Sequence, residues 1–223
     1  MKKMRIGLFG GTFNPIHLGH LRAAEIVQKR FLLDKVLFIP SYIPPHKNSV
    51  EIAPPFARLE MVKIACSSYP QFLPSSVEIE AKGKSYSILT VNKIEKMFPE
   101  AWIFFILGVD SFLEIETWRE YEELLQLCFF IVVSRPGYRL EEAKEIKGKY
   151  RDRMYEIPES DESSEIRESL LSSFQIFLLP ISALDIASTE IRNRAKKGSS
   201  LKGMVPDAVE AYIKENKLYK EQN

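Results

Sequence analysis

Residues 10–20 form a segment, GGTFNPIHLGH, whose residue types and spacing are suited to binding an anion. The paired glycines allow the backbone to turn tightly and to approach a ligand closely, and Pro15 stiffens the loop. A helix is expected to begin near Leu18, and its first turn would point free N–H groups and the positive end of its dipole at the turn. This segment therefore predicts a cradle for phosphate.

His17 and His20 lie three residues apart at this helix start, so both rings can project toward the same anion. The same spacing occurs in metal sites, but a third Cys, Asp or His ligand is missing nearby, and a helix N-terminus disfavours a cation. Phosphate recognition is therefore the better interpretation, and no metal ligands are predicted. The alternative is an ordinary helix start that the glycines and a capping histidine merely organise.

The loop at residues 39–47, IPSYIPPHK, carries the third histidine of the chain, His46, and Lys47. It follows an expected strand, and its prolines favour an extended backbone. Lys47 could place a point charge on a phosphate. An ordinary turn with a solvated lysine explains this loop at least as well.

The second segment with phosphate-binding character is ASTEIR, at residues 187–192. Ser188 and Thr189 fit the N-cap and first turn of a helix, and Arg192 lies within one turn of Ser188. Hydroxyl groups, free N–H groups and a guanidinium could thus converge on one triphosphate tail. Taken alone, an ordinary capped helix with an exposed arginine is the more frequent explanation of such a segment.

Strands and helices alternate along the chain, which predicts a parallel sheet wrapped by helices. Hydrophobic periodicity places strands at residues 5–9, 35–39, 77–80, 102–107, 128–133 and 175–179, and helices at 18–31, 58–65, 88–97, 121–127, 189–197 and 206–216. In such a sheet, ligands bind at the carboxyl ends of the strands. Residues 138–173 are rich in charged residues and serine without a strong apolar period, and we expect them to form a surface insertion, partly helical or mobile.

Composition narrows the class of protein. The chain has 223 residues, is 45% hydrophobic and carries a formal net charge of +1, so it can bury a full core, while charge favours neither a nucleic-acid nor a membrane partner. No apolar stretch has the length of a signal peptide or a membrane helix. Cys66 and Cys128 lie in apolar stretches without metal-ligand spacing, which predicts buried free thiols and a cytoplasmic protein.

The segments at 10–20 and 188–192 together resemble the paired HxGH and STxIR signatures of the nucleotidylyltransferase superfamily. The landmarks between them resemble bacterial nicotinate-nucleotide adenylyltransferases, in order and over nearly the whole chain. These landmarks are IPPHK at 43–47, GKSYS at 83–87, LGVDS at 107–111, Trp118 and SRPG at 134–137. The resemblance implies an α/β fold, namely a Rossmann-like parallel sheet with helices on both faces and a small C-terminal helical part. It also implies an enzyme that joins the adenylyl group of ATP to nicotinate mononucleotide in NAD biosynthesis.

The resemblance also implies a role for each matching residue. His17, His20 and Arg192 would be catalytic, the histidines holding the ATP phosphates and Arg192 gripping the β- and γ-phosphates together with Ser188. Asp110 would bind a ribose hydroxyl, Trp118 would stack on the pyridine ring, backbone near Ser87 would accept the nicotinate carboxylate, and Lys47 would meet phosphate. The remaining expected substrate contacts are Gly10, Gly11, Thr12, Phe13, Asn14, Gly108, Arg135 and Thr189. A magnesium ion is expected on the polyphosphate, held mainly by phosphate oxygens and water.

Three positions depart from the family pattern: Asn14 stands where aspartate is common, Ala187 where another serine is usual, and Ser87 where threonine is usual.

We expect one nucleotidylyltransferase domain over residues 1–223, with a core at 1–137, the insertion at 138–173, and a last strand and C-terminal helices at 174–223. The amide mononucleotide is an alternative acceptor, and a non-catalytic nucleotide-binding domain is an alternative of another class. Phosphopantetheine as acceptor is disfavoured by His17, where such relatives have threonine. The sequence leaves the acid-versus-amide preference, the oligomeric state (a homo-oligomer included), the role of the insertion, kinetics and regulation open.

Overall fold

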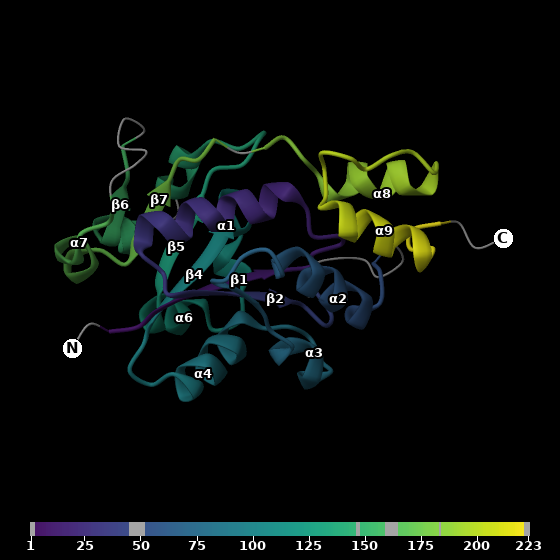
Figure 1. Cartoon of the computed structure of the whole chain (residues 1–223). Coiled ribbons are helices and arrows are strands. Elements are labelled where there is room, and N and C mark those ends of the chain that lie inside the picture. Colours follow the sequence, from purple (N-terminus) through teal and green to yellow (C-terminus); the bar gives the residue numbers. More distant parts are fainter. Residues whose placement is uncertain (1–2, 45–51, 146–147, 159–164, 183, 221–223) are drawn as a thin grey trace. The chain divides into compact units, whose positions relative to one another are not determined.

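The computed structural model describes residues 3–44, 52–145, 148–158, 165–182 and 184–220, and their helices and strands alternate along the chain (Figure 1). The strands are β1 Arg5–Gly11, β2 Lys35–Pro40, β3 Phe72–Pro74, β4 Trp102–Gly108, β5 Phe129–Val133, β6 Met154–Glu156 and β7 Ile176–Leu179. The α-helices are α1 Leu18–Phe31, α2 Pro55–Cys66, α3 Val77–Ala81, α4 Ser87–Met97, α5 Val109–Leu113, α6 Tyr121–Leu127, α7 Glu168–Ser173, α8 Ser188–Lys196 and α9 Asp207–Glu215. Short 3-10 helices are η2 Ile115–Thr117, η3 Leu140–Glu145 and η4 Gly148–Arg153.

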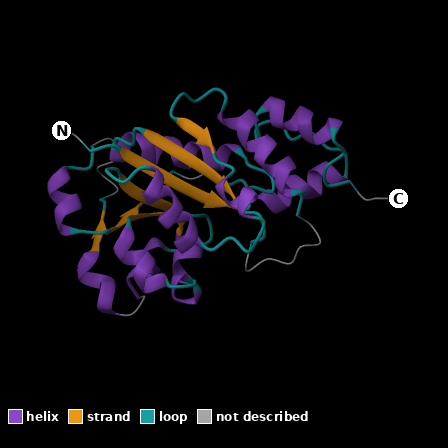
Figure 2. Cartoon of the chain, turned by 90° about the horizontal axis from the view of Figure 1, so that it is seen from below, coloured by secondary structure: helices purple, strands orange, loops and turns teal. Residues whose placement is uncertain are grey.

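The strands form one seven-stranded sheet in the order β3-β2-β1-β4-β5-β7-β6. The pairs β1–β4, β4–β5, β5–β7 and β6–β7 are parallel. Figure 2 shows helices beside the strands of this sheet. The Rossmann-like α/β class expected from the sequence is confirmed.

Alternation along β4 and β5 sends aromatic side chains to both faces of the sheet. Phe104 lies next to Phe129 and Phe31, at ring-centroid distances of 4.9 and 5.8 Å, and so faces α1. Its neighbour Phe105 faces the other way, toward Phe130 at 5.5 Å and Trp118 at 5.9 Å. Burial on both faces explains why these strands are continuous apolar runs rather than alternating ones.

Two compact units divide the chain. The first comprises Met1–Gly10, Ala23–Leu37 and Tyr86–Ala183, and the second comprises Gly11–Arg22, Phe38–Ser85 and Leu184–Asn223. In the first unit, α4 and α6 lie side by side below the strands in the view of Figure 1. In the second, α9 packs on α2. A single domain stays a prediction.

The expected strand at 77–80 is wrong, because these residues belong to the one-turn helix α3. Val77 and Ile79 are both buried, and a buried pair two residues apart occurs in strands and also in a short helix that is packed on several sides. Over so few residues the two periods cannot be told apart. The helix ends at Ala81, and the C-cap residue Lys82 has a left-handed backbone φ of 49°.

The interpretation of residues 138–173 as a surface insertion is wrong in part. The segment contributes the edge strand β6, which pairs with β7, and it buries apolar side chains such as Ala143, Ile157 and Ile166. Its α7 residue Glu168 also receives a hydrogen bond from the buried guanidinium of Arg5, at 3.1 Å. Isolated apolar residues among many charges thus anchor the segment, without the regular period that would have identified it.

The two cysteines are free and buried, which confirms that prediction. Burial raises the pKa of both thiols, that of Cys66 to about 12. Within the described part of the chain, no helix has both the length and the apolar character needed to cross a membrane.

Candidate active site

The loop at residues 11–17 leaves β1 through an unusual backbone conformation. Phe13 has a φ of 46°, in the left-handed region that a non-glycine residue seldom adopts. Its ring is buried, packs against Phe38 at 5.8 Å, and lies 3.2 Å from where a Cβ at Gly11 would be. The packed ring therefore holds the turn, and glycine at position 11 leaves room for it.

The two histidines of the HxGH segment stack on each other at the start of α1. Their ring centroids are 3.6 Å apart with an interplanar angle of 29°, and His17 is buried. The backbone N–H of His17 donates to Nδ1 of His20 at 3.2 Å. Because Nδ1 accepts this bond, the neutral His20 ring carries its hydrogen on Nε2, which makes that nitrogen a donor.

Gly19 separates the histidines for a steric reason. A Cβ at this position would lie 3.1 Å from Nδ1 and 3.2 Å from Cε1 of His17. The ring of His17 thus lies directly on the helix backbone, at a distance that side chains other than glycine would disturb. The glycine of the HxGH segment is therefore a packing requirement.

The N-terminus of α8 meets the loop that carries Asn14 and Pro15, within the second unit. The Ser188 hydroxyl donates to the carbonyl oxygen of Pro15 at 3.1 Å. The Arg192 guanidinium donates to the carbonyl oxygen of Asn14 at 3.2 Å and to the Thr189 hydroxyl at 3.3 Å. The two segments singled out from the sequence, more than 170 positions apart, therefore lie against each other.

The cap of α8 differs from the one expected. Ala187, not Ser188, occupies the N-cap position, and it offers no side-chain cap. Ser188 is the first helical residue, and its hydroxyl is used on the loop instead. Because alanine stands at position 187, the N-cap residue of α8 makes no side-chain cap, and such a helix start is able to bind an anion.

Two residues that the sequence did not single out support this loop. Arg58 is fully buried and donates to the carbonyl oxygens of Thr12, Ala53 and Tyr42 at 2.8, 2.9 and 3.1 Å. Burial lowers its pKa to about 10. Tyr219 donates from its hydroxyl to Asn14. An arginine among the apolar residues of the predicted helix at 58–65 was the available signal for Arg58; nothing in the sequence distinguished Tyr219.

Residues expected to recognise the pyridine group lie in the first unit. Ser87 is the first residue of α4, whose N-terminus has no side-chain cap. The guanidinium of Arg119 lies over the ring of Tyr86, 5.2 Å from its centroid, so the segment that contains Trp118 is next to this helix start. The Trp118 ring meets Phe105 edge to face at 5.9 Å.

The turn after β4 brings three more expected residues together. Arg135 donates to the Asp110 carboxylate at 2.7 Å. A Cβ on Gly108 would clash with the Asp110 carboxylate and would lie 2.6 Å from Cδ of Arg135. Glycine at position 108 therefore lets this ion pair close over the backbone at the end of the strand. Gly10, at the end of β1 in the same unit, has room for a Cβ, with Phe105 at 3.8 Å.

Other expected residues lie elsewhere. His46 and Lys47 fall outside the described residues, and the role expected for Lys47 stays a prediction. The described residues contain no group of three His, Cys, Asp or Glu side chains placed to hold a metal ion. The carboxamide oxygen of Asn14 accepts bonds from the N–H of Ala53 and the hydroxyl of Tyr219, both at 3.0 Å, so this side chain is engaged within the protein.

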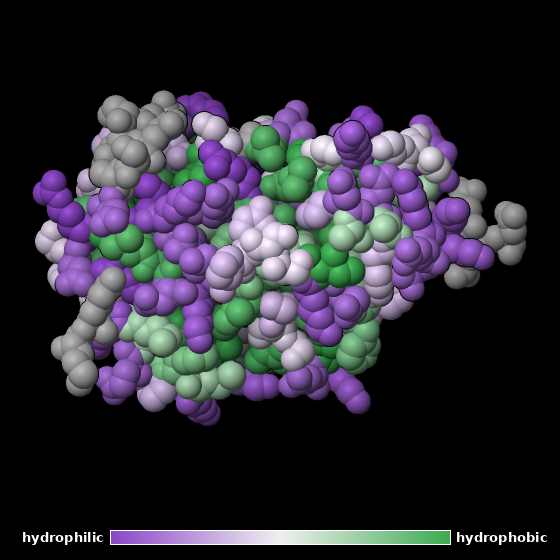
Figure 3. All heavy atoms as spheres, in the orientation of Figure 1, coloured by the Kyte–Doolittle hydropathy of each residue, from purple (hydrophilic) through white to green (hydrophobic). Residues whose placement is uncertain are grey.

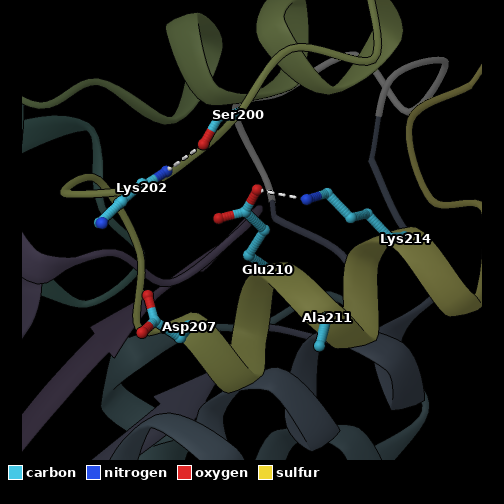
Figure 4. A pocket seen from close by; sticks show the side chains of 6 residues that line it. All are labelled: Ser200, Lys202, Asp207, Glu210, Ala211 and Lys214. Atoms are coloured by element: carbon cyan, nitrogen blue, oxygen red, sulfur yellow. Dashed lines mark hydrogen bonds and ion pairs between the residues drawn. The ribbon is translucent and has the colours of Figure 1, made fainter.

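A surface pocket beside α9 is lined by Glu210 and Lys214 (Figure 4). Glu210 holds a turn that contacts the start of α1. The Glu210 carboxylate lies between the Lys214 ammonium group, at 2.6 Å, and the N–H of Leu201, at 3.1 Å. These contacts lower the pKa of Glu210, the bond from Lys214 most, followed by that from Leu201. The turn that begins at Leu201 presents the carbonyl oxygen of Met204 to the N–H of Leu18, the first residue of α1.

The exposed large hydrophobic residues of the described chain are far apart in sequence. The face drawn in Figure 3 mixes hydrophobic and hydrophilic surface. Among the described residues the concentrated chemistry is thus at the two helix starts and the loop of the second unit. Two stacked imidazoles, the Arg192 guanidinium, the Thr189 hydroxyl and the N–H groups at the start of α8 form a donor set that suits a polyphosphate. Such a set can offset negative charge without a nucleophile or a strong base.

The chain is similar to known proteins over nearly its whole length. A model of the cytidylyltransferase-like family matches residues 8–194. A protein of Citrifermentans bemidjiense named "Probable nicotinate-nucleotide adenylyltransferase" is 41% identical over 221 residues, covering 97% of this chain and 98% of that relative. A protein of the same name from Thermus thermophilus is 40% identical over 217 residues, covering 97% of this chain and all of the relative (100%).

Solved structures show the same fold. Nicotinic acid mononucleotide adenylyltransferase from Plasmodium falciparum, complexed with NaAD, superposes with a TM-score of 0.70 at 19% identity, over 97% of each chain. The same enzyme complexed with APC gives a TM-score of 0.69 at 18% identity, again over 97% of each chain. On the strength of the family match and of the sequence relatives, the chain belongs to the cytidylyltransferase-like family and to the family of nicotinate-nucleotide adenylyltransferases.

Proposed function

We propose that this enzyme transfers the adenylyl group of ATP to nicotinate mononucleotide, forming nicotinate adenine dinucleotide and pyrophosphate. A phosphate oxygen of the mononucleotide forms a bond to the α-phosphorus of ATP, and the bond from that phosphorus to the α,β-bridging oxygen breaks. Its electron pair leaves with pyrophosphate. The acceptor is already a nucleophile, so the protein must align the reactants and offset charge on the leaving group.

The observation that carries this proposal is the junction of α8 with the loop of the HxGH segment. Arg192 and the uncapped N–H groups of α8 would bind the β- and γ-phosphates, with Ser188 and Thr189 beside them. His20, whose Nε2 is a donor in the neutral ring, would stabilise the charge that develops on the phosphates in the transition state. His17 would hold the phosphates and, through its backbone N–H, orient the His20 ring. Gly11, Thr12 and Phe13 would shape the turn next to them.

The first unit carries the features that suit the pyridine nucleotide. Backbone N–H groups at Ser87 would donate hydrogen bonds to the nicotinate carboxylate at the N-terminus of α4. Trp118 would stack on the pyridine ring. Asp110, already paired with Arg135, would bind a ribose hydroxyl. We infer a preference for the acid because an uncapped helix start favours a carboxylate over a neutral amide.

Magnesium would enter with ATP as part of the substrate. The described residues provide no cluster of protein ligands for it, so phosphate oxygens and water would be its ligands. When bound, it would neutralise charge on the polyphosphate. The free cysteines suit the reducing cytoplasm, where we place the enzyme.

The test is to incubate the purified protein with ATP, magnesium and either the acid or the amide mononucleotide. Pyrophosphate release and dinucleotide formation are measured by a coupled assay and by chromatography. We expect both products, with kcat/KM higher for the acid. Equal or reversed values would remove the acid preference, and ATP binding without any product would favour a non-catalytic nucleotide-binding domain.

Variants separate catalysis from binding. His20→Ala should lower kcat far more than it weakens ATP binding, because the charge it stabilises develops in the transition state. Arg192→Ala should lower kcat/KM for ATP. Its matched control is Arg194→Ala on the same helix, where the arginine pairs with Glu190 on the surface. If the two arginine variants lost activity equally, the assignment of Arg192 would be wrong.

A further inference from the structure

Tyr219 comes from the segment that follows α9, and the backbone of that segment turns back sharply. The N–H of Leu218 donates to the carbonyl oxygen of Ile213 at 3.0 Å. Lys217 and Tyr219 both have left-handed backbone conformations, with φ values of 52° and 64°. Non-glycine residues in this region are strained, and they persist where surrounding contacts fix them. The contact that the Tyr219 side chain makes is therefore one that can hold this backbone conformation in place.

The Tyr219 hydroxyl donates to the carboxamide oxygen of Asn14 at 3.0 Å, across 205 positions of sequence. The same oxygen accepts the N–H of Ala53. Burial raises the pKa of Tyr219 well above its ordinary value, although the nearby charges of Arg192 and Arg58 act in the opposite direction. The hydroxyl thus keeps its proton and remains a donor.

Asn14 links this contact to the phosphate-binding residues. Its side chain is fixed by Tyr219 and Ala53, and its carbonyl oxygen accepts the hydrogen bond from Arg192. Asn14 is buried, and so is its bond from Ala53, while the bonds from Tyr219 and Arg192 are partly buried. A shift of the Asn14 backbone would move the carbonyl oxygen that holds the guanidinium of Arg192, and the two bonds to the Asn14 side chain restrain such a shift.

We propose that Tyr219 is a positioning residue for adenylyl transfer, which acts through Asn14 to hold the loop and Arg192 in place for the ATP polyphosphate. This inference rests on the proposed function. It assigns the C-terminal segment a part in the reaction rather than in the fold alone.

Tyr219→Phe removes the hydroxyl and keeps the ring. We expect kcat/KM for ATP to fall about tenfold, the upper end of the scale for one lost hydrogen bond that is partly buried. KM for the mononucleotide should stay unchanged. The control is Tyr212→Phe on α9, because within the described residues the Tyr212 hydroxyl makes no hydrogen bond.

A double-mutant cycle with Asn14→Ala distinguishes positioning from a general structural role. If Tyr219 acts through Asn14, Tyr219→Phe should cause no further loss of kcat/KM in the Asn14→Ala background. Additive losses, or an unchanged kcat/KM in Tyr219→Phe, would overturn the inference. If Tyr219→Phe and Tyr212→Phe lowered kcat/KM equally, the effect would be structural and the inference would likewise fail.

ATP binding gives a readout that does not depend on the acceptor. Isothermal titration calorimetry with ATP and magnesium should show a dissociation constant about fivefold higher for Tyr219→Phe than for the wild type. Absence of dinucleotide in the wild-type assay would refute the proposed function, and the positioning role would then stand or fall on this titration. Equal ATP affinity together with equal kcat/KM would refute the positioning role alone.

Discussion

Replacing Gly19 by alanine separates the stability of α1 from the placement of the histidines. The added Cβ would lie 3.1 Å from Nδ1 of His17, which is closer than ordinary van der Waals contact. His17 is buried and stacked on His20 at 3.6 Å, so its ring cannot retreat without moving its partner. The substitution therefore acts on both rings of the HxGH segment.

We expect Gly19→Ala to maintain or raise the free energy of unfolding and to lower kcat/KM. Alanine in a helix is favoured over glycine by up to about 1 kcal/mol, so the free energy of unfolding should hold or rise slightly. The His17 ring must shift by a few tenths of an ångström. Because a misplacement of about 1 Å can cost about 100-fold in rate, we expect kcat/KM to fall about tenfold, equivalent to about 1.4 kcal/mol in the transition state.

The assay pairs thermal unfolding, followed by circular dichroism, with steady-state kinetics on ATP and nicotinate mononucleotide. A Tm within about 2 °C of the wild type, or above it, together with the tenfold loss would support the reasoning. Unchanged kinetics would show that the placement of the His17 ring does not matter. A large fall in Tm would show that the added methyl group destabilises the whole protein rather than displacing the His17 ring alone, and would contradict the prediction.

Three further predictions address the rest of the structure. Gly108→Ala should lower kcat/KM through displacement of the Asp110 carboxylate, since the extended backbone of Gly108, with φ of −75°, suits alanine; an active variant would contradict the close packing there. Glu210, whose pKa is lowered in the folded state, contributes stability that is present above its ordinary pKa of 4.5 and lost as pH falls through the folded value. The wild-type Tm should thus fall more steeply below about pH 4.5 than that of Glu210→Gln; parallel curves would refute this. Cys66 and Cys128, whose pKa values are raised by burial, should react with a thiol reagent at pH 8 far more slowly in the native protein than in denaturant.

Much of the fold could be predicted because its elements are long and strongly patterned. The apolar runs that became β4 and β5 are buried on both faces, and the sequence shows this directly as Phe104–Phe105 and Phe129–Phe130. Short elements were missed or mistaken for the opposite reason. β6 spans three residues and becomes a strand only because β7 is available to pair with it.

Some residues of the candidate site could likewise be predicted from the sequence, and others could not. The glycines and histidines of the HxGH segment stand close together in sequence, so their chemistry could be inferred before any coordinates. Arg58 and Tyr219 act by donating to Thr12 and Asn14, residues far from them along the chain. Such long-range hydrogen bonds leave no local pattern, and their donors look like an ordinary helix arginine and an ordinary terminal tyrosine.

The bond between Arg192 and Asn14, 178 positions apart, also bears on how the protein is made. A ribosome synthesises the chain from the N-terminus, so β1 and the start of α1 are complete long before the guanidinium emerges from the exit tunnel. Until then the nascent loop lacks its partner. Tight capture of nucleotide would accordingly begin only after Arg192 has left the tunnel, and ATP would stabilise chains that include α8 over chains truncated before it.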